Sequence, residues 1–298
     1  MDEISGRLVL GTAQLGSAYG VANISGKPGL GEARAIVHMA LEQGIRTFDT
    51  AHAYGDSEQV LGESLKGVIE PVHIVTKLPP DITMDFPVRE SLARSLDMLQ
   101  RESVYGLLLH REEQLPLLDG IPGKQLVRLV EAGTLSKLGV SVYSSEAAIR
   151  ALHHPLVSLV QLPASLFDRR FEVSGAFALA RQLGKELHIR SALLQGVLCM
   201  EPDALPDYLA PLAPSLATFH GICLEHALSP ASLALAWALQ RYSESFVLFG
   251  AERPEQVQHN LGMLSKAESV LPTLAAPLET IMPPQVDTLL NPSLWDTP

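Results

Sequence analysis

Short apolar segments alternate with longer segments of helical periodicity along the chain, from Arg7 to about Leu264. Eight of the apolar segments read as strands, and their unbroken hydrophobic character is typical of strands buried on both faces of a parallel sheet. Eight βα units in one chain most naturally close into a barrel, so we expect an α/β fold of the (β/α)8 TIM-barrel type. The expected strands cover residues 7–10, 47–51, 72–78, 105–110, 137–142, 156–162, 187–193 and 246–251.

Polar side chains and a glycine stand at or near the carboxyl ends of these expected strands. In a barrel these ends meet on one face, where barrel active sites form. A doubly wound sheet is the alternative fold, but it would bring these residues together less well, and the chain has no GxGxxG turn after its first strand. The strand-end residues are Asp49, Lys77, His110, Ser141, Gln161, Arg190 and Gly250.

The segment from Gly44 to Glu58, GIRTFDTAHAYGDSE, sets a carboxylate and a phenol a few residues apart. Asp49 ends a strand, and Tyr54 lies in the turn before a helix whose N-cap we expect at Asp56 or Ser57. A phenol has a pKa near ~10, so it is a poor proton donor at neutral pH unless a nearby cation stabilises its phenolate. Lys77, next to last in VHIVTKL, and His110, which ends YGLLLH, are the candidates for that cation.

Seven motifs, taken in order, resemble the aldo/keto reductase family and together cover most of the chain. DTAxxYG followed by TK and LLLH at family-like spacings is the most specific part of the resemblance. The motifs are LGTAQLG (residues 10–16), GIRTFDTAHAYG (44–55), TK (76–77), LLLHR (107–111), KLGVS (137–141), VQLPASLFDRR (160–170) and FGAERPEQVQHN (249–260).

The resemblance implies an oxidoreductase that reduces an aldehyde or ketone to an alcohol by hydride transfer from a nicotinamide nucleotide. Tyr54 would be the general acid, and Lys77 would lower its pKa. Asp49 would pair with Lys77 and fix it, while His110 would orient or polarise the carbonyl of a small substrate. No metal is needed for this chemistry.

The same resemblance implies a set of cofactor contacts. Ser141 and Gln161 match positions that bind the nicotinamide carboxamide, while Val142 departs from the asparagine that is common there. Arg190 takes the place of an aromatic residue that often stacks on the nicotinamide; a guanidinium can stack too, and a surface ion pair is the alternative. The full implied set is Gly11, Thr12, Asp49, Ser141, Gln161, Arg190, Ser191, Leu193, Gln195, Gly250, Ala251, Glu252, Arg253, Gln256 and Asn260.

At the adenine end the sequence departs from the family pattern. Glu252 replaces a residue that is often basic, and Gln256 stands where some members carry arginine. A carboxylate repels a 2′-phosphate but accepts a hydrogen bond from a 2′-hydroxyl. Arg253 can still support a 2′-phosphate, and Asn260 matches an adenine contact. We expect NADP(H) as the family default, with NAD(H) as the alternative.

Composition limits the remaining classes of partner. The net charge of −11 argues against nucleic acid and anionic membrane surfaces, whose binding needs concentrated Lys and Arg. No apolar run approaches the ~18 residues of a membrane span, and the start resembles no secretory signal, so we expect a cytoplasmic protein. With only Cys199 and Cys223, a disulfide framework is excluded. The oligomeric state is left open.

The last segment has a different character from the rest. Leu271 to Pro298 carries six prolines, few charges and Trp295. We divide the chain into a barrel over residues 1–265 and a C-terminal tail over 266–298. Tails of this kind in the resembled family often fold over the barrel mouth and line the substrate site. A surface-packed or disordered end is the alternative.

Two other functions stay open at this stage. One is a barrel of the same family that binds nicotinamide nucleotide as a sensor or partner subunit with little turnover, and the complete set of four catalytic residues counts against it. The other is a barrel lyase or isomerase, which would need a phosphate-binding glycine loop after a late strand. Gln195-Gly196 and residues 249–251 are only weak candidates for such a loop.

Overall fold

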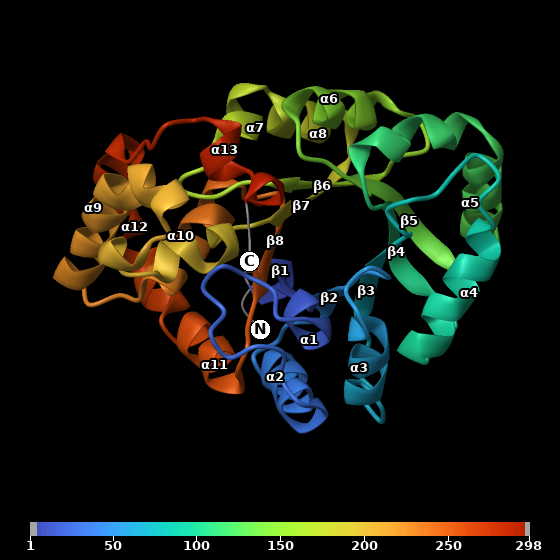
Figure 1. The fold of residues 1–298 in the computed structure, drawn as a ribbon, viewed down its shortest axis with the longest axis horizontal. Helices are drawn as coiled ribbons and strands as arrows, with labels where there is room; N and C mark the ends of the chain where they lie inside the picture. The colour runs from blue at the N-terminus through green and yellow to red at the C-terminus, as the bar shows by residue number, and fades with distance from the viewer. Residues whose placement is uncertain (1–4, 296–298) are drawn as a thin grey trace.

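Eight parallel strands close into a barrel in chain order in the computed structural model, which describes residues 5–295 (Figure 1). Strand β1 closes the ring, because Leu10 lies opposite Phe48 of β2 on one side and Phe249 of β8 on the other. This architecture confirms the predicted (β/α)8 TIM barrel. The strands are β1 (Leu8–Gly11), β2 (Thr47–Asp49), β3 (His73–Lys77), β4 (Val104–Leu109), β5 (Leu135–Ser141), β6 (Leu159–Pro163), β7 (Glu186–Arg190) and β8 (Phe246–Gly250).

Helices surround the barrel on its outside (Figure 1). The α-helices are α1 (Ala13–Gly16), α2 (Leu30–Glu42), α3 (Ser57–Ser64), α4 (Val88–Leu99), α5 (Ile121–Glu131), α6 (Ser145–His153), α7 (Arg170–Val173), α8 (Ala176–Leu183), α9 (Ala213–Glu225), α10 (Pro230–Arg241), α11 (Pro254–Gly262), α12 (Leu264–Thr280) and α13 (Asp287–Leu290). Short 3-10 helices are η1 (Ser5–Arg7), η2 (Glu112–Asp119), η3 (Leu194–Cys199), η4 (Pro202–Ala204), η5 (Asp207–Leu212) and η6 (Pro292–Leu294).

Two of these helices show how the sequence sets their position. In α2 the residues at helical spacing from Ala33 to Ala40 are fully buried, so this apolar stripe faces the barrel. At the start of α10 the Ser229 hydroxyl accepts a hydrogen bond from the backbone N–H of Ser232, and Pro230 occupies the first turn.

Two segments differ from the sequence-based expectation. The seventh strand ends at Arg190 rather than Leu193, because Ser191 has a φ of 60° and cannot continue a strand. Residues 113–123, whose two prolines and two glycines predict an irregular loop after His110, form most of η2 and the start of α5. The physical reason is burial, since Leu115 and Leu118 turn inward to the core.

The apolar core has two parts. Most of it fills the space between the barrel and its helices, while a small separate cluster of Val75, Leu108 and Leu159 fills the barrel interior. Gly139 makes room for this cluster, because a Cβ there would lie 2.3 Å from the Leu159 carbonyl oxygen. The interior is therefore packed below the carboxyl ends of the strands, where polar residues take over.

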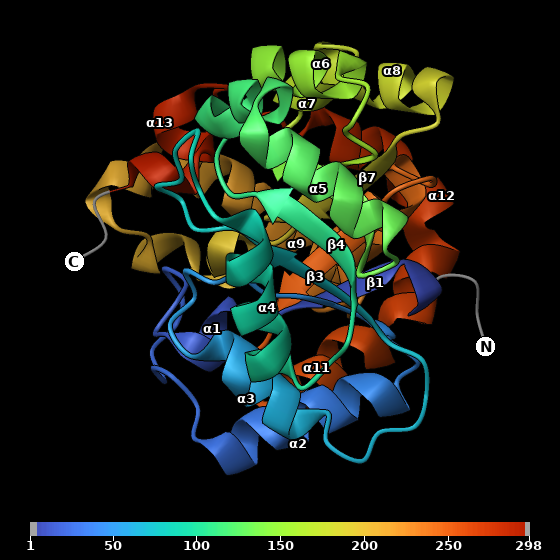
Figure 2. The same ribbon diagram turned by 90° about the vertical axis from the view of Figure 1, so that its right-hand side faces the viewer.

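The C-terminal part of the chain begins with a helix. Helix α12 spans the expected boundary at 265/266 and packs against α10, although Pro272 and Pro277 lie inside it. Beyond it, Gln285 donates to the Phe167 carbonyl at 2.8 Å, which fastens this segment to the loop after β6. Figure 2 shows α13 at the end of the barrel toward which β4 points. The tail therefore packs beside the rim near β6.

Within residues 5–295, no single helix is both long enough and apolar enough to cross a membrane. The segments Asp207–Glu225 and Pro230–Arg241 meet the criteria of length and composition only as a pair, with a bend of 97° at the break between them. In this pair, α10 is a core helix that is buried from Ala231 to Leu239.

Candidate active site

A pocket of about 450 Å³ opens at the carboxyl ends of the strands, between the loops that follow β1, β2, β7 and β8. It brings together Tyr54 and most of the residues implied for cofactor binding. Three of that implied set, Ser141, Ala251 and Arg253, do not line it. The implied residues that do line it are Gly11, Thr12, Asp49, Gln161, Arg190, Ser191, Leu193, Gln195, Gly250, Glu252, Gln256 and Asn260.

A buried ion pair joins Asp49, which lines this pocket, to Lys77, which like His110 does not. Lys77 Nζ lies 2.6 Å from Asp49 Oδ1 and donates a second hydrogen bond to the Thr50 carbonyl at 2.9 Å. The other carboxylate oxygen, Asp49 Oδ2, accepts from Gln161 Nε2 at 2.8 Å. The side chains of Lys77 and Asp49 are only 1% and 4% exposed. The pair is therefore held rigidly, because each charge has several fixed partners.

The turn that carries Tyr54 packs tightly against the loop after β1. A Cβ on Gly16 would lie 1.7 Å from the Tyr54 carbonyl oxygen, and a Cβ on Gly55 would lie 2.4 Å from the Gly16 carbonyl oxygen. Ser57 ties the same two segments together by donating to the Thr12 carbonyl at 2.7 Å. The two glycines and this hydroxyl therefore fix where the phenol stands. Asp56 is the N-cap position of α3, and its side chain makes no cap hydrogen bond.

The phenol of Tyr54 stays protonated in this environment. Burial raises its pKa above the ordinary value, and the charge of Asp49 and the ring of Tyr143 raise it further, whereas Arg190 lowers it. Lys77 Nζ lies 4.9 Å from the centre of the Tyr54 ring and 2.6 Å from Asp49 Oδ1. Arg190 is thus a cation beside this phenol that was not expected to act on its pKa, and the role expected of Lys77 stays a prediction.

His110 stands edge-on to Tyr54, with ring centres 6.0 Å apart. Burial, reinforced by Lys77, lowers the pKa of His110 to about 4, so the imidazole is neutral at pH 7. Its Nδ1 is buried and has no hydrogen-bond partner. A neutral imidazole can donate one hydrogen bond toward a substrate oxygen.

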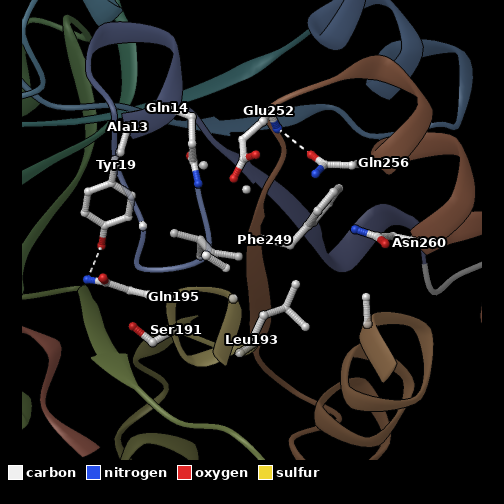
Figure 3. A pocket seen from close by; sticks show the side chains of 18 of the residues that line it. Ala13, Gln14, Tyr19, Ser191, Leu193, Gln195, Phe249, Glu252, Gln256 and Asn260 are labelled. Atoms are coloured by element: carbon white, nitrogen blue, oxygen red, sulfur yellow. Dashed lines mark hydrogen bonds between the residues drawn. The ribbon is translucent and has the colours of Figure 1, made fainter. Parts of the chain in front are cut away.

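The far end of the pocket carries Glu252 and Gln256 (Figure 3). The side-chain carbonyl of Gln256 turns back to the chain and accepts from the backbone N–H of Glu252 at 2.6 Å. Burial raises the pKa of Glu252. Arg253 points elsewhere, since its Nη2 donates to Ser25 Oγ at 2.9 Å. Figure 3 shows the amide of Gln14 directed toward the Glu252 side of the pocket.

Arg190 packs on Tyr143 and forms no surface ion pair with residues 5–295. Its guanidinium carbon lies 3.8 Å from the centre of the Tyr143 ring, and its Nη2 donates to the Val142 carbonyl at 2.8 Å. Within residues 5–295 it forms no salt bridge. One face of the guanidinium is therefore covered by Tyr143, while the residue still lines the pocket.

Several lining residues were not identified from the sequence. Gln14, Tyr19, Phe249 and His259 all lie inside or next to recognised motifs, yet only the fold turns them to the pocket. The motif LGTAQLG contains Gln14 and is the one signal that could have found it. Within the described part of the chain, no group of three or more His, Cys, Asp or Glu side chains could hold a metal ion.

The fold and the pocket define a parallel (β/α)8 barrel with a buried Asp–Lys ion pair and a phenol at the carboxyl ends of its strands. The sequence model described as "Aldo/keto reductase family" matches residues 7–271. The chain belongs to the aldo/keto reductase family and is an oxidoreductase.

Relatives with similar sequences carry names that agree with this assignment. The chain is 27% identical over 282 residues to a protein of Strobilurus tenacellus named aldo-keto reductase str7, covering 86% of this chain and 82% of that protein. It is also 27% identical over 260 residues to a probable aldo-keto reductase 1 of Glycine max, covering 78% of this chain and 74% of that protein.

Solved structures share the fold at lower sequence identity. The holo form of an aldo-keto reductase from Bacillus halodurans, AKR11C1, is 20% identical with a TM-score of 0.72, over 94% of this chain and 93% of that one. A glycerol dehydrogenase from Gluconobacter oxydans, AKR11B4, is 21% identical with a TM-score of 0.71, over 91% of each chain. At these identities the likeness shows the fold alone.

Proposed function

We propose that the protein reduces small aldehydes or ketones to alcohols with a nicotinamide nucleotide as co-substrate and Tyr54 as the general acid. One observation carries this proposal: the Tyr54 phenol stands beside the buried Asp49–Lys77 pair, in a pocket that continues to Asn260. An acid and an elongated binding site thus share one cavity, as hydride transfer to a carbonyl requires.

The residues of this pocket fit a dinucleotide. Gly11 and Gly250 lie opposite each other at the ends of β1 and β8, and a Cβ on Gly250 would lie 2.3 Å from Gln14 Nε2. The absence of a side chain at Gly250 therefore lets the Gln14 amide pack directly on the backbone of β8, where both residues line the pocket. In the loop after β7, Gln195 and Gly196 have φ values of 52° and 92°. Left-handed residues of this kind turn backbone N–H groups toward one side, which suits a diphosphate.

The catalytic residues would divide the work as follows. A bound nicotinamide supplies the hydride, which no side chain can donate. Tyr54 donates its proton to the oxygen that becomes an alkoxide, and neutral His110 donates a hydrogen bond to the same oxygen. The Asp49–Lys77 pair supports the Tyr54 ring from below. Gln161 donates an amide N–H to Asp49, so its side-chain carbonyl is free to accept a hydrogen bond from the nicotinamide carboxamide.

Replacement of Tyr54 by phenylalanine tests this assignment. The variant keeps the ring but loses the proton, so we expect kcat for a simple aldehyde to fall by at least ~100-fold while nucleotide affinity changes little. Tyr208→Phe, on exposed η5, is the matched control and should behave like the wild type. Near-normal turnover of several aldehydes by Tyr54→Phe would rule this phenol out as the acid.

The same experiment addresses the alternatives. Wild-type protein that binds the nucleotide but reduces no aldehyde or ketone would be a nucleotide-binding sensor or partner subunit. Wild-type protein that binds neither NADH nor NADPH would favour a lyase or isomerase. The rigid Asp49–Lys77 pair beside Tyr54 supports the enzyme over both.

The nucleotide itself is the finer part of the proposal. The family resemblance implies NADP(H), but the charged residue that lines the ribose end is Glu252, whereas Arg253 is bound to Ser25 outside the lining. A carboxylate repels a 2′-phosphate and accepts from a 2′-hydroxyl. The geometry therefore supports NAD(H), the alternative in the sequence analysis.

Glu252→Arg tests this choice. The change replaces a repulsive contact by a charge-assisted hydrogen bond, worth roughly 1.5–3 kcal/mol, so the Kd ratio of NADH to NADPH should rise about tenfold or more. The effect should shrink at high salt. Glu255→Arg changes the same charge at an exposed position outside the pocket and should leave the ratio unaltered. An unchanged ratio in Glu252→Arg would mean that this side chain does not face the ribose.

A further inference from the structure

The substrate end of the pocket carries a cation that no carboxylate neutralises. Arg190 ends β7 and lines the pocket together with Tyr54. Its Nη2 is bound to the Val142 carbonyl and its plane rests on Tyr143, but its Nε is buried without a hydrogen-bond partner. No salt bridge within residues 5–295 includes Arg190.

The titratable groups around it leave this charge uncancelled. Asp49 and Lys77 neutralise each other across 2.6 Å. His110 is neutral, because burial lowers its pKa to about 4. Tyr54 is neutral, because burial raises its pKa. Arg190 therefore gives this end of the pocket one uncompensated positive charge, in a protein whose net charge is −11.

The carboxylate of Glu112 already accepts hydrogen bonds from the loop that carries Tyr143. Glu112 accepts hydrogen bonds from the backbone N–H of Tyr143 at 2.6 Å and of Ser144 at 2.9 Å, and from the Ser144 hydroxyl at 2.7 Å. These contacts hold the Tyr143 ring under the guanidinium. Glu112 thus fixes the orientation of Arg190 without neutralising it.

A further donor faces the same space. Gln195 Nε2 donates to the Tyr19 hydroxyl at 3.0 Å, so the proton of that hydroxyl stays free for a ligand (Figure 3). The Tyr19 hydroxyl therefore adds a hydrogen-bond donor to the pocket that Arg190 lines.

We propose that Arg190 binds a carboxylate on the substrate, so that the enzyme prefers aldehydes or ketones that carry one. This inference rests on the carbonyl reduction proposed above. A partly buried guanidinium without a counter-ion is costly, and an anionic ligand offsets that cost. Its planar fork matches a carboxylate, and the contacts with Tyr143 and Val142 fix its orientation in advance. A single cation suits a carboxylate better than a phosphate dianion.

Matched substrates test the proposal. kcat/KM is measured for 4-carboxybenzaldehyde and for its neutral isostere 4-carbamoylbenzaldehyde. A second pair, glyoxylate and glycolaldehyde, tests a shorter distance between the carbonyl and the carboxylate. We expect the wild type to favour the carboxylate in at least one pair by about tenfold or more, the scale of one charge-assisted hydrogen bond. The preference should fall as salt rises.

Variants assign the preference to its residue. Arg190→Gln should lower kcat/KM for the favoured carboxylate by about tenfold or more and for its neutral partner by less than about threefold. Arg190→Lys should recover part of the loss. Lys27→Gln is the control, since Lys27 pairs with exposed Asp56 outside the pocket lining and its loss removes the same charge. It should leave the preference unchanged.

Two results would overturn the inference. One is equal kcat/KM for both members of both pairs in the wild type; the other is an equal loss for carboxylate and neutral substrates in Arg190→Gln. Reduction of neutral aldehydes with no preference leaves the proposed function intact. A protein that reduces no carbonyl contradicts the proposed function. In that case titration calorimetry tests Arg190 separately: the wild type should bind benzoate more tightly than benzamide, and Arg190→Gln should bind the two equally. Equal binding of the two by the wild type would refute the assignment.

Discussion

Replacing Lys77 by methionine is expected to destabilise the protein strongly. Methionine retains most of the side-chain bulk but removes the ammonium that lies 2.6 Å from Asp49. The carboxylate, whose side chain is 4% exposed, would keep Gln161 as its remaining side-chain donor. Breaking a buried ion pair by removing one partner costs about 3–5 kcal/mol. For a chain of this size that loss corresponds to a fall in Tm of roughly 5–8 °C.

Calorimetric melting at pH 7 measures this effect, and two further variants make the comparison sharp. Lys27→Met breaks the pair with Asp56, whose partners are 37% and 48% exposed, and should cost less than about 1 kcal/mol. The double variant Asp49→Leu/Lys77→Met removes both buried charges and should recover most of the lost stability. If Lys77→Met melts no lower than Lys27→Met, the reasoning about a dry, rigid pair is wrong.

Two further predictions concern stability. Because burial lowers the pKa of His110 from 6.5 to about 4, its neutral form stabilises the fold above pH 6.5. That contribution, roughly 2–3 kcal/mol, is lost as the pH falls toward 4; urea unfolding at pH 4.5 and 7 should show a smaller difference for His110→Gln. Ending the chain after Leu271 removes buried Leu274 and Leu278. Unfolding should then cost at least about 4 kcal/mol less, whereas ending it after Met282 keeps α12 and should cost far less stability.

The barrel was predictable because the burial of each strand is evident from its own local sequence. Each strand is a short apolar run, and every expected strand overlaps an observed one. The end of β7 was not predictable, since Ser191 takes a left-handed conformation only to start the loop that reaches the pocket. Residues 113–123 are helical because Leu115 is buried in the core, and no local sequence pattern predicts that burial.

The chemistry of the site was predictable in its residue types but not in its contacts. Asp49 and Lys77 meet because adjacent strand ends are neighbours in any such barrel. The stacking of Arg190 on Tyr143 joins the ends of two strands that are not neighbours, so no spacing in the sequence signals it. The contact of Tyr19 with Gln195 spans 176 positions and depends on two loops folding over the same pocket.

The tail shows a conflict between local and tertiary preferences. Pro272 and Pro277 argue against a helix, because each lacks an N–H and crowds the preceding turn. The residues nevertheless form α12, since burial of Leu274 and Leu278 fixes the helix in place. Arg169 supports this arrangement from the loop after β6 by donating to the Leu278 carbonyl at 3.1 Å. Packing thus overrides the proline signal.

Transfer of a labelled hydride tests the central claim most directly. The wild-type protein is mixed with reduced nucleotide that carries deuterium at the transferring C4 position, both NADH and NADPH in separate reactions, and with 4-carboxybenzaldehyde. We predict an alcohol with one deuterium on the carbinol carbon by mass spectrometry, and a rate of its formation at least ~100-fold lower in Tyr54→Phe. An alcohol without deuterium, or no alcohol from either nucleotide, would contradict carbonyl reduction at this site.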